Sequence, residues 1–305
     1  MRNEILVGSR GSGLALAQAN EVVRALRELT HQYRYRVISI KTTGDKLSES
    51  REGVFDGKGV FTKEIEERLL KGEIQVAVHS MKDLAADLPS GLTVAAVPRR
   101  ADHRDAFISR NKGNLDRLPG GATIGTSSPR RRTQLLATRS DLRILEMHGN
   151  VESRLRKLEG GNYDGIVVAA AGLVRLGLEK RITEILSTKI MLPAIGQGAL
   201  AVEAREDDIE TVKLVSRLDD QSTRRAVEAE RAFARKLGAN CRTPVAAYAR
   251  VDDSGLAIDG MVASPDGRKL LRSQLVSTNP RPESVGEELA DSLLGKGAQF
   301  ILEAV

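Results

Sequence analysis

Basic and hydroxyl side chains cluster where four predicted strands give way to helices. The four segments are residues 8–12 (Gly-Ser-Arg-Gly-Ser), 79–83 (His-Ser-Met-Lys-Asp), 126–132 (Thr-Ser-Ser-Pro-Arg-Arg-Arg) and 147–154 (Met-His-Gly-Asn-Val-Glu-Ser-Arg). Free backbone N–H groups and the helix dipole favour anions at such junctions, and arginine binds a carboxylate or phosphate through two hydrogen bonds. The pattern predicts a cleft for several carboxylates or phosphates. Because GxxxxGK[ST] and GxGxxG motifs are lacking, a nucleotide is disfavoured.

Two further side chains have the chemistry to take part in bond making. Asp83 is a carboxylate among cations, where it can stabilise a developing positive charge or hold an ammonium group, although aspartate more commonly caps a helix or turn. Cys241 is the only cysteine, so it forms no internal disulfide and builds no thiolate metal site, and no metal is predicted. It lies beside Arg242 and is either a nucleophile or attachment point, or a small buried apolar residue.

Composition restricts the class of protein. The 305 residues include 47 basic and 41 acidic side chains, a net charge of +6 that attracts polyanions. Four Tyr, five Phe and no Trp offer few stacking surfaces, which disfavours a binder of single-stranded nucleic acid. No apolar run is long enough to span a membrane. The single cysteine and the lack of a signal-peptide pattern predict a cytoplasmic protein.

The elements that must position these residues follow an α/β rhythm up to about residue 218. Strands are expected at 5–7, 35–40, 74–78, 123–125, 142–146 and 164–169, in a mostly parallel sheet arrangement. Ser12, Ser128 and Asn150 are predicted helix N-caps, and Pro129 suits a first helical position. Beyond a helix at 222–237, strands at 245–251, 256–263 and 269–276 and a helix at 283–294 predict an antiparallel α+β region.

Eight ordered segments resemble one family, the porphobilinogen deaminases or hydroxymethylbilane synthases, over essentially the whole chain. The segments are residues 10–15, 42–45, 58–61, 78–83, 104–107, 125–131, 192–198 and the loop around Cys241. The resemblance implies two α/β lobes like those of periplasmic binding proteins and a C-terminal α+β domain with a three-stranded antiparallel sheet. It places the domains at 1–98 with 199–217, at 99–198, and at 218–305.

The resemblance also implies an activity. A dipyrromethane cofactor is attached by a thioether to Cys241. Four porphobilinogen molecules are joined to it head to tail with loss of ammonia, and water releases the linear tetrapyrrole hydroxymethylbilane. Such proteins are expected to be monomers that bind neither nucleic acid nor membranes. Pyrroles with acetate and propionate side chains fit the predicted anion cleft.

Residue roles follow from the same resemblance. The implied catalytic residues are Asp83, Lys82 and Arg10. The implied cofactor-binding residues are Cys241, Asp83, Lys82, Ser80, Thr126, Ser127, Ser128, Arg130 and Arg131. The implied substrate-binding residues are Arg10, Ser12, Lys58, Phe61, His148, Gly149, Arg154, Arg175 and Gln197. Lys58 and Phe61 flank the polar segment 45–58, which is either a lid or a solvated loop.

The chain departs from the family pattern at three places. His148 stands where arginine is usual, so binding there is expected to weaken as the imidazole loses its proton. Ala239 and Asn240 replace paired glycines before the cysteine, and Pro129 replaces a leucine. Two rival classes remain: a non-catalytic solute-binding protein, which would have no use for Cys241 or the third domain, and a basic nucleic-acid binder. An inactive relative is a third alternative, which the retained Asp83 and Lys82 oppose.

Overall fold

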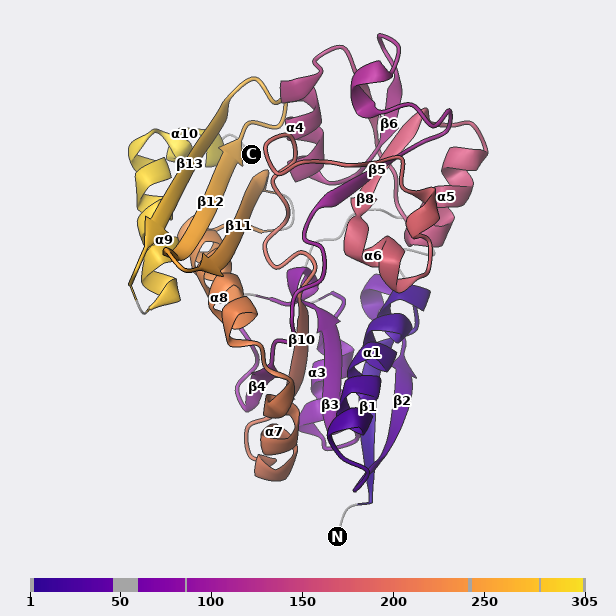
Figure 1. The fold of residues 1–305 in the computed structure, drawn as a ribbon, viewed down its shortest axis with the longest axis vertical. Helices are drawn as coiled ribbons and strands as arrows, with labels where there is room; N and C mark the ends of the chain where they lie inside the picture. Colours follow the sequence, from indigo (N-terminus) through magenta and orange to yellow (C-terminus); the bar gives the residue numbers. More distant parts are fainter. Residues whose placement is uncertain (1–2, 46–59, 86, 241–242, 280, 304–305) are drawn as a thin grey trace. The chain divides into compact units, whose positions relative to one another are not determined.

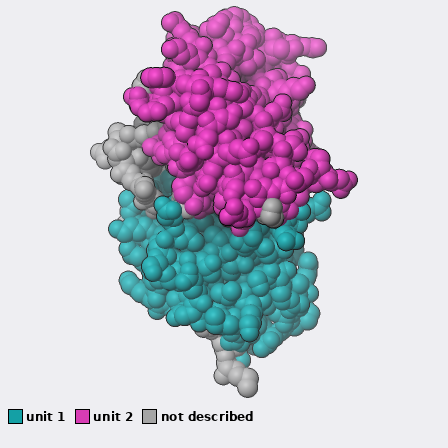
Figure 2. Space-filling view, turned by 90° about the vertical axis from the view of Figure 1, so that its left-hand side faces the viewer, with its two compact units in different colours: residues 1–101, 199–224 teal, residues 102–198, 225–305 magenta. Residues whose placement is uncertain are grey.

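The structure is a computed structural model that describes residues 3–45, 60–85, 87–240, 243–279 and 281–303. The chain divides into two compact units, coloured separately in Figure 2. Unit 1 comprises residues 1–101 and 199–224, and unit 2 comprises residues 102–198 and 225–305. Across the described residues, no helix has both the length and the apolar character needed to cross a membrane.

Unit 1 is built on a five-stranded sheet whose strands run in the order β2-β1-β3-β10-β4 (Figure 1). Its strands are β1 (Glu4–Arg10), β2 (Arg34–Ile40), β3 (Val76–Ser80), β4 (Leu92–Ala96) and β10 (Leu200–Arg205). Its helices include α1 (Gly13–Leu29), α3 (Lys63–Leu70), α7 (Ile209–Val215) and the short 3-10 helix η1 (Met81–Asp83). Strand β1 is parallel to β2 and β3, while β10 is antiparallel to β3 and β4. Alternate side chains of β1 and β3 join the core under α1.

Unit 2 carries a second five-stranded sheet, in the order β7-β6-β8-β5-β9. Its strands are β5 (Asp105–Ser109), β6 (Thr123–Gly125), β7 (Arg143–Leu145), β8 (Gly165–Ala169) and β9 (Glu184–Ile185). The helices after these strands include α4 (Pro129–Thr138), α5 (Val151–Glu159) and α6 (Ala170–Arg175). Here too a parallel core, β7-β6-β8, meets an antiparallel neighbour, β5. The two sheets therefore share one strand pattern.

The C-terminal part of unit 2 forms the predicted three-stranded antiparallel sheet. Its elements are β11 (Val245–Asp252), β12 (Gly255–Ala263), β13 (Leu270–Ser277), α9 (Pro282–Gly295) and α10 (Ala298–Leu302), and it packs with α8 (Gln221–Lys236). Gly260 on β12 permits close packing, because a Cβ there would lie 2.8 Å from Phe233 of α8 and from Leu289 of α9. The predicted fold class, two α/β lobes with a C-terminal α+β region, is confirmed, and the exact domain limits stay a prediction.

Local signals in the sequence locate the strand-to-helix junctions correctly. Ser12 accepts a hydrogen bond from the Ala15 N–H at the start of α1, Ser128 accepts one from Arg131, and Asn150 accepts one from Ser153. Pro129 lies in the first turn of α4, as predicted. Each cap satisfies a backbone donor that has no partner within the helix.

Four strands, β4, β5, β9 and β10, were not predicted, and they change the character of both sheets. Strands β4, β5 and β10 pair antiparallel with their neighbours, so the sheets are mixed rather than mostly parallel. Strand β10 lies beside β3 although more than a hundred residues separate them in sequence. Such a pairing depends on tertiary packing and leaves no local periodicity from which to read it.

Candidate active site

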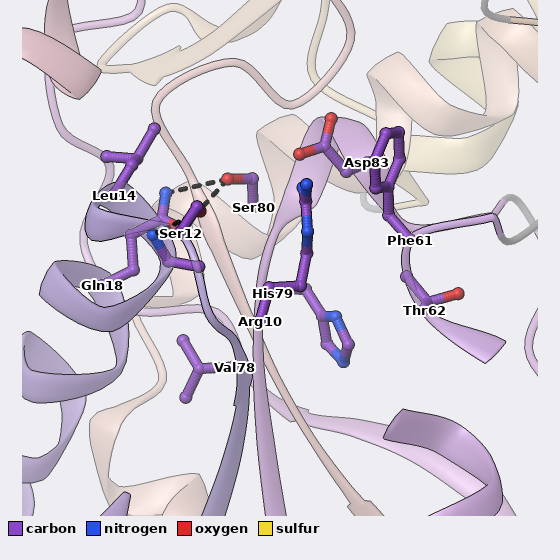
Figure 3. Close-up of a pocket in the computed structure, with 11 residues that line it drawn as sticks. Arg10, Ser12, Leu14, Gln18, Phe61, Thr62, Val78, His79, Ser80 and Asp83 are labelled. Atoms are coloured by element: carbon purple, nitrogen blue, oxygen red, sulfur yellow. Dashed lines mark hydrogen bonds between the residues drawn. The ribbon is translucent and has the colours of Figure 1, made fainter. Parts of the chain in front are cut away.

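A pocket in unit 1 gathers side chains from the ends of β1 and β3 (Figure 3). Its cavity of about 50 Å³ has room for a carboxylate group. The polar residues lining it are Arg10, Ser12, Gln18, Thr62, His79, Ser80 and Asp83. In Figure 3, the exposed carboxylate of Asp83 and the guanidinium of Arg10 both point into this pocket. The structure thus brings together five residues that the sequence predicted for the site: Arg10, Ser12, Phe61, Ser80 and Asp83.

Arg10 is held in place from two sides. Its Nε and Nη2 donate to Asp45 Oδ1 at 3.1 and 2.6 Å, and its Cζ lies 4.0 Å from the centroid of the Phe61 ring. The pKa of Asp45 is lowered, because the hydrogen bonds and charge of Arg10 together with Thr42 outweigh the opposing effect of burial. Phe61 therefore supports a cation here, a contact that the sequence did not predict.

The remaining site residues predicted in unit 1 either lie near this pocket or fall outside the described residues. Lys82 is half-buried in η1 next to Asp83. Ser80 Oγ accepts from Gln18 Nε2 at 2.8 Å and lies 3.1 Å from Gln18 Oε1. Gln18 was not predicted as a site residue. Its position in α1, about one and a half turns after the Ser12 N-cap, is the one feature of the sequence that could have indicated it. Lys58 and most of the segment 45–58 lie outside the described residues.

In unit 2, two neighbouring arginines bind one buried carboxylate. Arg130 Nη1 donates to Asp105 Oδ2 at 2.8 Å, and Arg131 donates through Nε and Nη2 to Asp105 Oδ1 at 2.9 and 2.7 Å. Burial alone would raise the pKa of Asp105, but the charges of Arg130 and Arg131 outweigh it and lower this pKa to about 2. Arg130 also donates to Leu192 O at 2.7 Å. Both arginines are thus fixed by their own lobe.

Arg154 differs from these two. Its Nε donates to Gly149 O at 2.8 Å, and within the described parts of the chain no carboxylate lies within ion-pair distance of it. Its pKa is lowered to about 10, first by desolvation and then by the charge of Arg131. A half-buried cation beside a second cation favours an anion, and the described residues supply no carboxylate within ion-pair distance of Arg154.

Hydroxyl groups and His148 surround the same junctions. Ser127 Oγ accepts from the Met147 N–H at 2.9 Å and lies 3.4 Å from His148 Nε2. Thr126 accepts from the Ser128 N–H at 3.2 Å. His148 is partly exposed and also lies 3.3 Å from Glu146 Oε2, a carboxylate that was not predicted from the sequence.

Of the remaining predicted residues, two donate hydrogen bonds to backbone carbonyls of unit 2, one supplies such a carbonyl, and one lies outside the described residues. Gly149 has a φ of 113°, which favours glycine, and it supplies the carbonyl that orients Arg154. Arg175 Nη2 donates to Gly198 O at 3.3 Å, and buried Gln197 donates to His103 O at 2.9 Å. Cys241 lies outside the described residues. Asp45 and Asp105 were missed as functional partners, although both fall in segments that carried the family resemblance.

The fold and these two groups of residues define a class: an α/β protein with paired lobes, each with cations and hydroxyls at its strand-to-helix junctions. Comparisons with known proteins identify the family. Residues 5–213 match the family profile described as "Porphobilinogen deaminase, dipyromethane cofactor binding domain", and residues 224–295 match "Porphobilinogen deaminase, C-terminal domain". The chain belongs to the porphobilinogen deaminase family.

Relatives of known name match along their whole length. The chain is 47% identical over 304 residues to porphobilinogen deaminase of Geobacillus sp. (strain WCH70), covering 99% of this chain and 97% of the relative. It is 48% identical over 305 residues to that of Desulforudis audaxviator, covering 100% and 99%. Among solved structures, a putative lipoprotein from Actinomyces odontolyticus is 13% identical, with a TM-score of 0.45 over 72% of this chain and 90% of that one.

Proposed function

We propose that this protein is a transferase of porphyrin and heme biosynthesis that makes hydroxymethylbilane. It joins four porphobilinogen molecules head to tail, with loss of ammonia at each step, on a dipyrromethane primer bound to Cys241, and water then releases the product. The observation that carries the proposal is the half-buried Arg154, which has no carboxylate partner among the described residues and whose pKa is lowered by burial and by the charge of Arg131. Such a group needs the carboxylate of a ligand, and pyrrole acids supply several.

The cations and hydroxyl groups of unit 2 also indicate whether the residues of this chain suit the proposed cofactor. The residues proposed to hold the acetate and propionate groups of the dipyrromethane are Thr126, Ser127, Ser128, Arg130, Arg131, Ser80 and Lys82, with Cys241 as the covalent anchor. When bound, the cofactor supplies the pyrrole carbon to which the first substrate ring is joined. Because Asp105 already neutralises part of the charge of Arg130 and Arg131, this region attracts carboxylates without an excess of buried positive charge.

The pocket of unit 1 is proposed to carry the chemistry, with Asp83 as its central group. When ammonia leaves the substrate, the methylene pyrrole becomes electron-poor, and the carboxylate of Asp83 stabilises that positive charge and assists proton transfer at the pyrrole nitrogen. Lys82 and Arg10 complete the catalytic set. A guanidinium has five N–H donors and Asp45 engages only Nε and Nη2, so Arg10 retains donors for a substrate carboxylate.

The remaining substrate contacts are assigned by position. Residues proposed to bind porphobilinogen or the growing chain are Ser12, Lys58, Phe61, His148, Gly149, Arg154, Arg175 and Gln197. The protein is proposed to act as a monomer in the cytoplasm, without nucleic acid or membrane. The single cysteine supports this compartment, because a reduced environment keeps an attachment thiol available. The proposed domains are 1–98 with 199–217, 99–198 and 218–305.

The intact mass of the purified, denatured protein tests the proposal most directly. We expect the polypeptide mass plus two porphobilinogens less two ammonias, and the bare mass for Cys241→Ala. Protein isolated without the addition should gain it when incubated with porphobilinogen and should then release hydroxymethylbilane. A chain that stays at the bare mass, binds porphobilinogen reversibly and releases no ammonia would instead be a solute-binding protein.

A further inference from the structure

Three titratable side chains lie together beneath the pocket of unit 1 and have no part in the proposed chemistry. His79 of β3 and Glu203 of β10 lie on one face of the sheet, with His79 Nε2 3.1 Å from Glu203 Oε2. The side chains of His79 and Glu203 are 3% and 0% exposed. Glu66, from α3 packed on this face, is also buried. We call these three residues the buried acid cluster.

The cluster has more carboxylates than it has groups to neutralise them. Glu203 Oε1 and Glu66 Oε1 are both buried without a hydrogen-bond partner in the described part of the chain. Even with a charged imidazole, two ionised carboxylates would leave one uncompensated negative charge in the protein interior. Such a charge is costly enough that a proton is bound instead.

Glu66 is the member best placed to keep that proton. Its pKa is raised, first by burial and further by the charge of Glu203, against the opposing effects of Thr62 and His79. Glu203 differs because it contacts the imidazole directly. The geometry therefore distinguishes Glu203, which lies beside the His79 imidazole, from Glu66, whose Oε1 is buried without a hydrogen-bond partner in the described part of the chain.

Several charged groups lie on the elements that pack around the cluster. They are Arg10 on β1, Lys63, Glu64, Glu67 and Arg68 on α3, Lys82 and Asp83 on η1, and Arg205 on β10. Three of the arginines bind other groups: Arg10 binds Asp45, Arg68 binds Glu73, and Arg205 binds Asp207 and Leu69 O. Within the described residues, no ion pair joins these three arginines to the cluster.

The cluster lies directly under the anion pocket. His79 and Thr62 both line that pocket, and the Glu66 N–H donates to Thr62 O at 2.9 Å in the first turn of α3. A negative charge on Glu66 would therefore repel a carboxylate that enters beside Arg10 and Ser12. With Glu66 protonated, the floor of the pocket does not oppose an anionic ligand.

We propose that the buried acid cluster is a proton-binding site that keeps Glu66 uncharged while an anionic ligand occupies the pocket, and that losing this proton weakens binding. The inference rests on the proposed function only in taking the ligand to be a carboxylate-bearing pyrrole. By linkage, ligand binding favours proton retention to the same extent that the proton favours binding. Glu66 thus acts on substrate binding through its charge state and does not contact the substrate.

The first test is spectroscopic and does not depend on turnover. The cofactor-loaded protein should show an infrared band of a protonated carboxyl group at neutral pH, and Glu66→Gln should lack it. The control is Glu67→Gln, which removes an exposed carboxylate from the same helix and should keep the band. Absence of the band in the parent protein, or its persistence in Glu66→Gln, would overturn the proposal.

The second test measures the Michaelis constant for porphobilinogen against pH. In the parent protein and in Glu67→Gln, KM should rise about threefold to tenfold on the alkaline side as Glu66 ionises. Glu66→Gln should lose this part of the rise while kcat at neutral pH is kept. An identical rise in Glu66→Gln refutes the coupling. Failure of every variant to consume porphobilinogen rejects the proposed function instead, and the infrared result then decides the proton site alone.

A second variant guards against a folding defect in Glu66→Gln. Glu203→Gln keeps an oxygen for His79 but removes the charge that disfavours ionisation of Glu66. The infrared band should then disappear at a lower pH than in the parent protein, and the KM rise should move the same way. An unchanged midpoint would show that the two carboxylates are not coupled.

Discussion

In unit 1 the pocket cation Arg10 is tied to a carboxylate of its own lobe, whereas in unit 2 Arg154 has no such partner among the described residues. Arg10 is the last residue of β1, and Arg154 lies near the start of α5, so each belongs to a junction of strand, polar cap and helix. The difference is one of charge. Unit 1 adds an exposed carboxylate, Asp83, to a cation that has a carboxylate partner. Unit 2 adds Arg154 to two arginines that share one carboxylate. This difference supports the proposal that unit 1 carries the chemistry on a cation and that unit 2 holds anions.

Asp83 provides the largest test of this difference. Asp83→Asn removes the charge with almost no change in shape, so turnover should fall about 10²- to 10⁴-fold while covalent loading of Cys241 persists. Because Asp83 is exposed, the melting temperature should hardly move. Asp87→Asn, a nearby exposed carboxylate, is the matched control and should keep its rate. Equal rates in the two variants would remove Asp83 from the chemistry.

The buried carboxylate of unit 2 should affect stability instead. Asp105→Asn leaves Arg130 and Arg131 without their shared anion, and the free energy of unfolding should fall by about 3–5 kcal/mol, measured by urea denaturation. Asp102→Asn breaks an exposed pair with Arg104 and should cost less than about 1 kcal/mol. A similar small loss for both would mean that the buried ion pairs contribute no more than the exposed one.

Asp105 also predicts how stability depends on pH. Its pKa is about 2 in the folded protein and about 3.9 in an unfolded chain, so the folded state is favoured once the group ionises. This contribution is present above about pH 4 and is lost as the pH falls towards 2. The slope of unfolding free energy against pH in this window should be shallower in Asp105→Asn, which has no group to titrate.

The strand-to-helix junctions could be predicted from the sequence. The difference between Arg10 and Arg154 in their carboxylate partners could not. Ser12, Ser128 and Asn150 were predicted as caps because capping depends on a few adjacent residues. The partners Asp45 and Asp105 come from loops and strands distant in sequence, and β5, which carries Asp105, was not predicted at all. That Arg154 has no carboxylate partner among the described residues is likewise a property of tertiary packing. Sequence therefore located the cations but not their state of neutralisation.

Arg154 gives the next largest effect. Arg154→Gln should raise KM or weaken cofactor retention about tenfold to a hundredfold, because a charge-assisted hydrogen bond to a ligand carboxylate is lost. Stability should stay level or increase, since the variant removes a cation whose only partner among the described residues is the carbonyl of Gly149. Arg156→Gln, exposed on the same helix, is the control. A destabilised Arg154→Gln with unchanged binding would make this arginine structural.

His148 should give the smallest effect, and one confined to pH. Its imidazole Nε2 lies 3.4 Å from Ser127 Oγ and 3.3 Å from Glu146 Oε2. KM for porphobilinogen should rise about twofold to fivefold between pH 5 and 8, the range in which histidine side chains in general change charge. His148→Arg should remove that rise while keeping the alkaline limb assigned to Glu66, and Glu66→Gln should do the reverse. A wild-type KM that does not change with pH between 5 and 8 would show that the charge of His148 takes no part in binding.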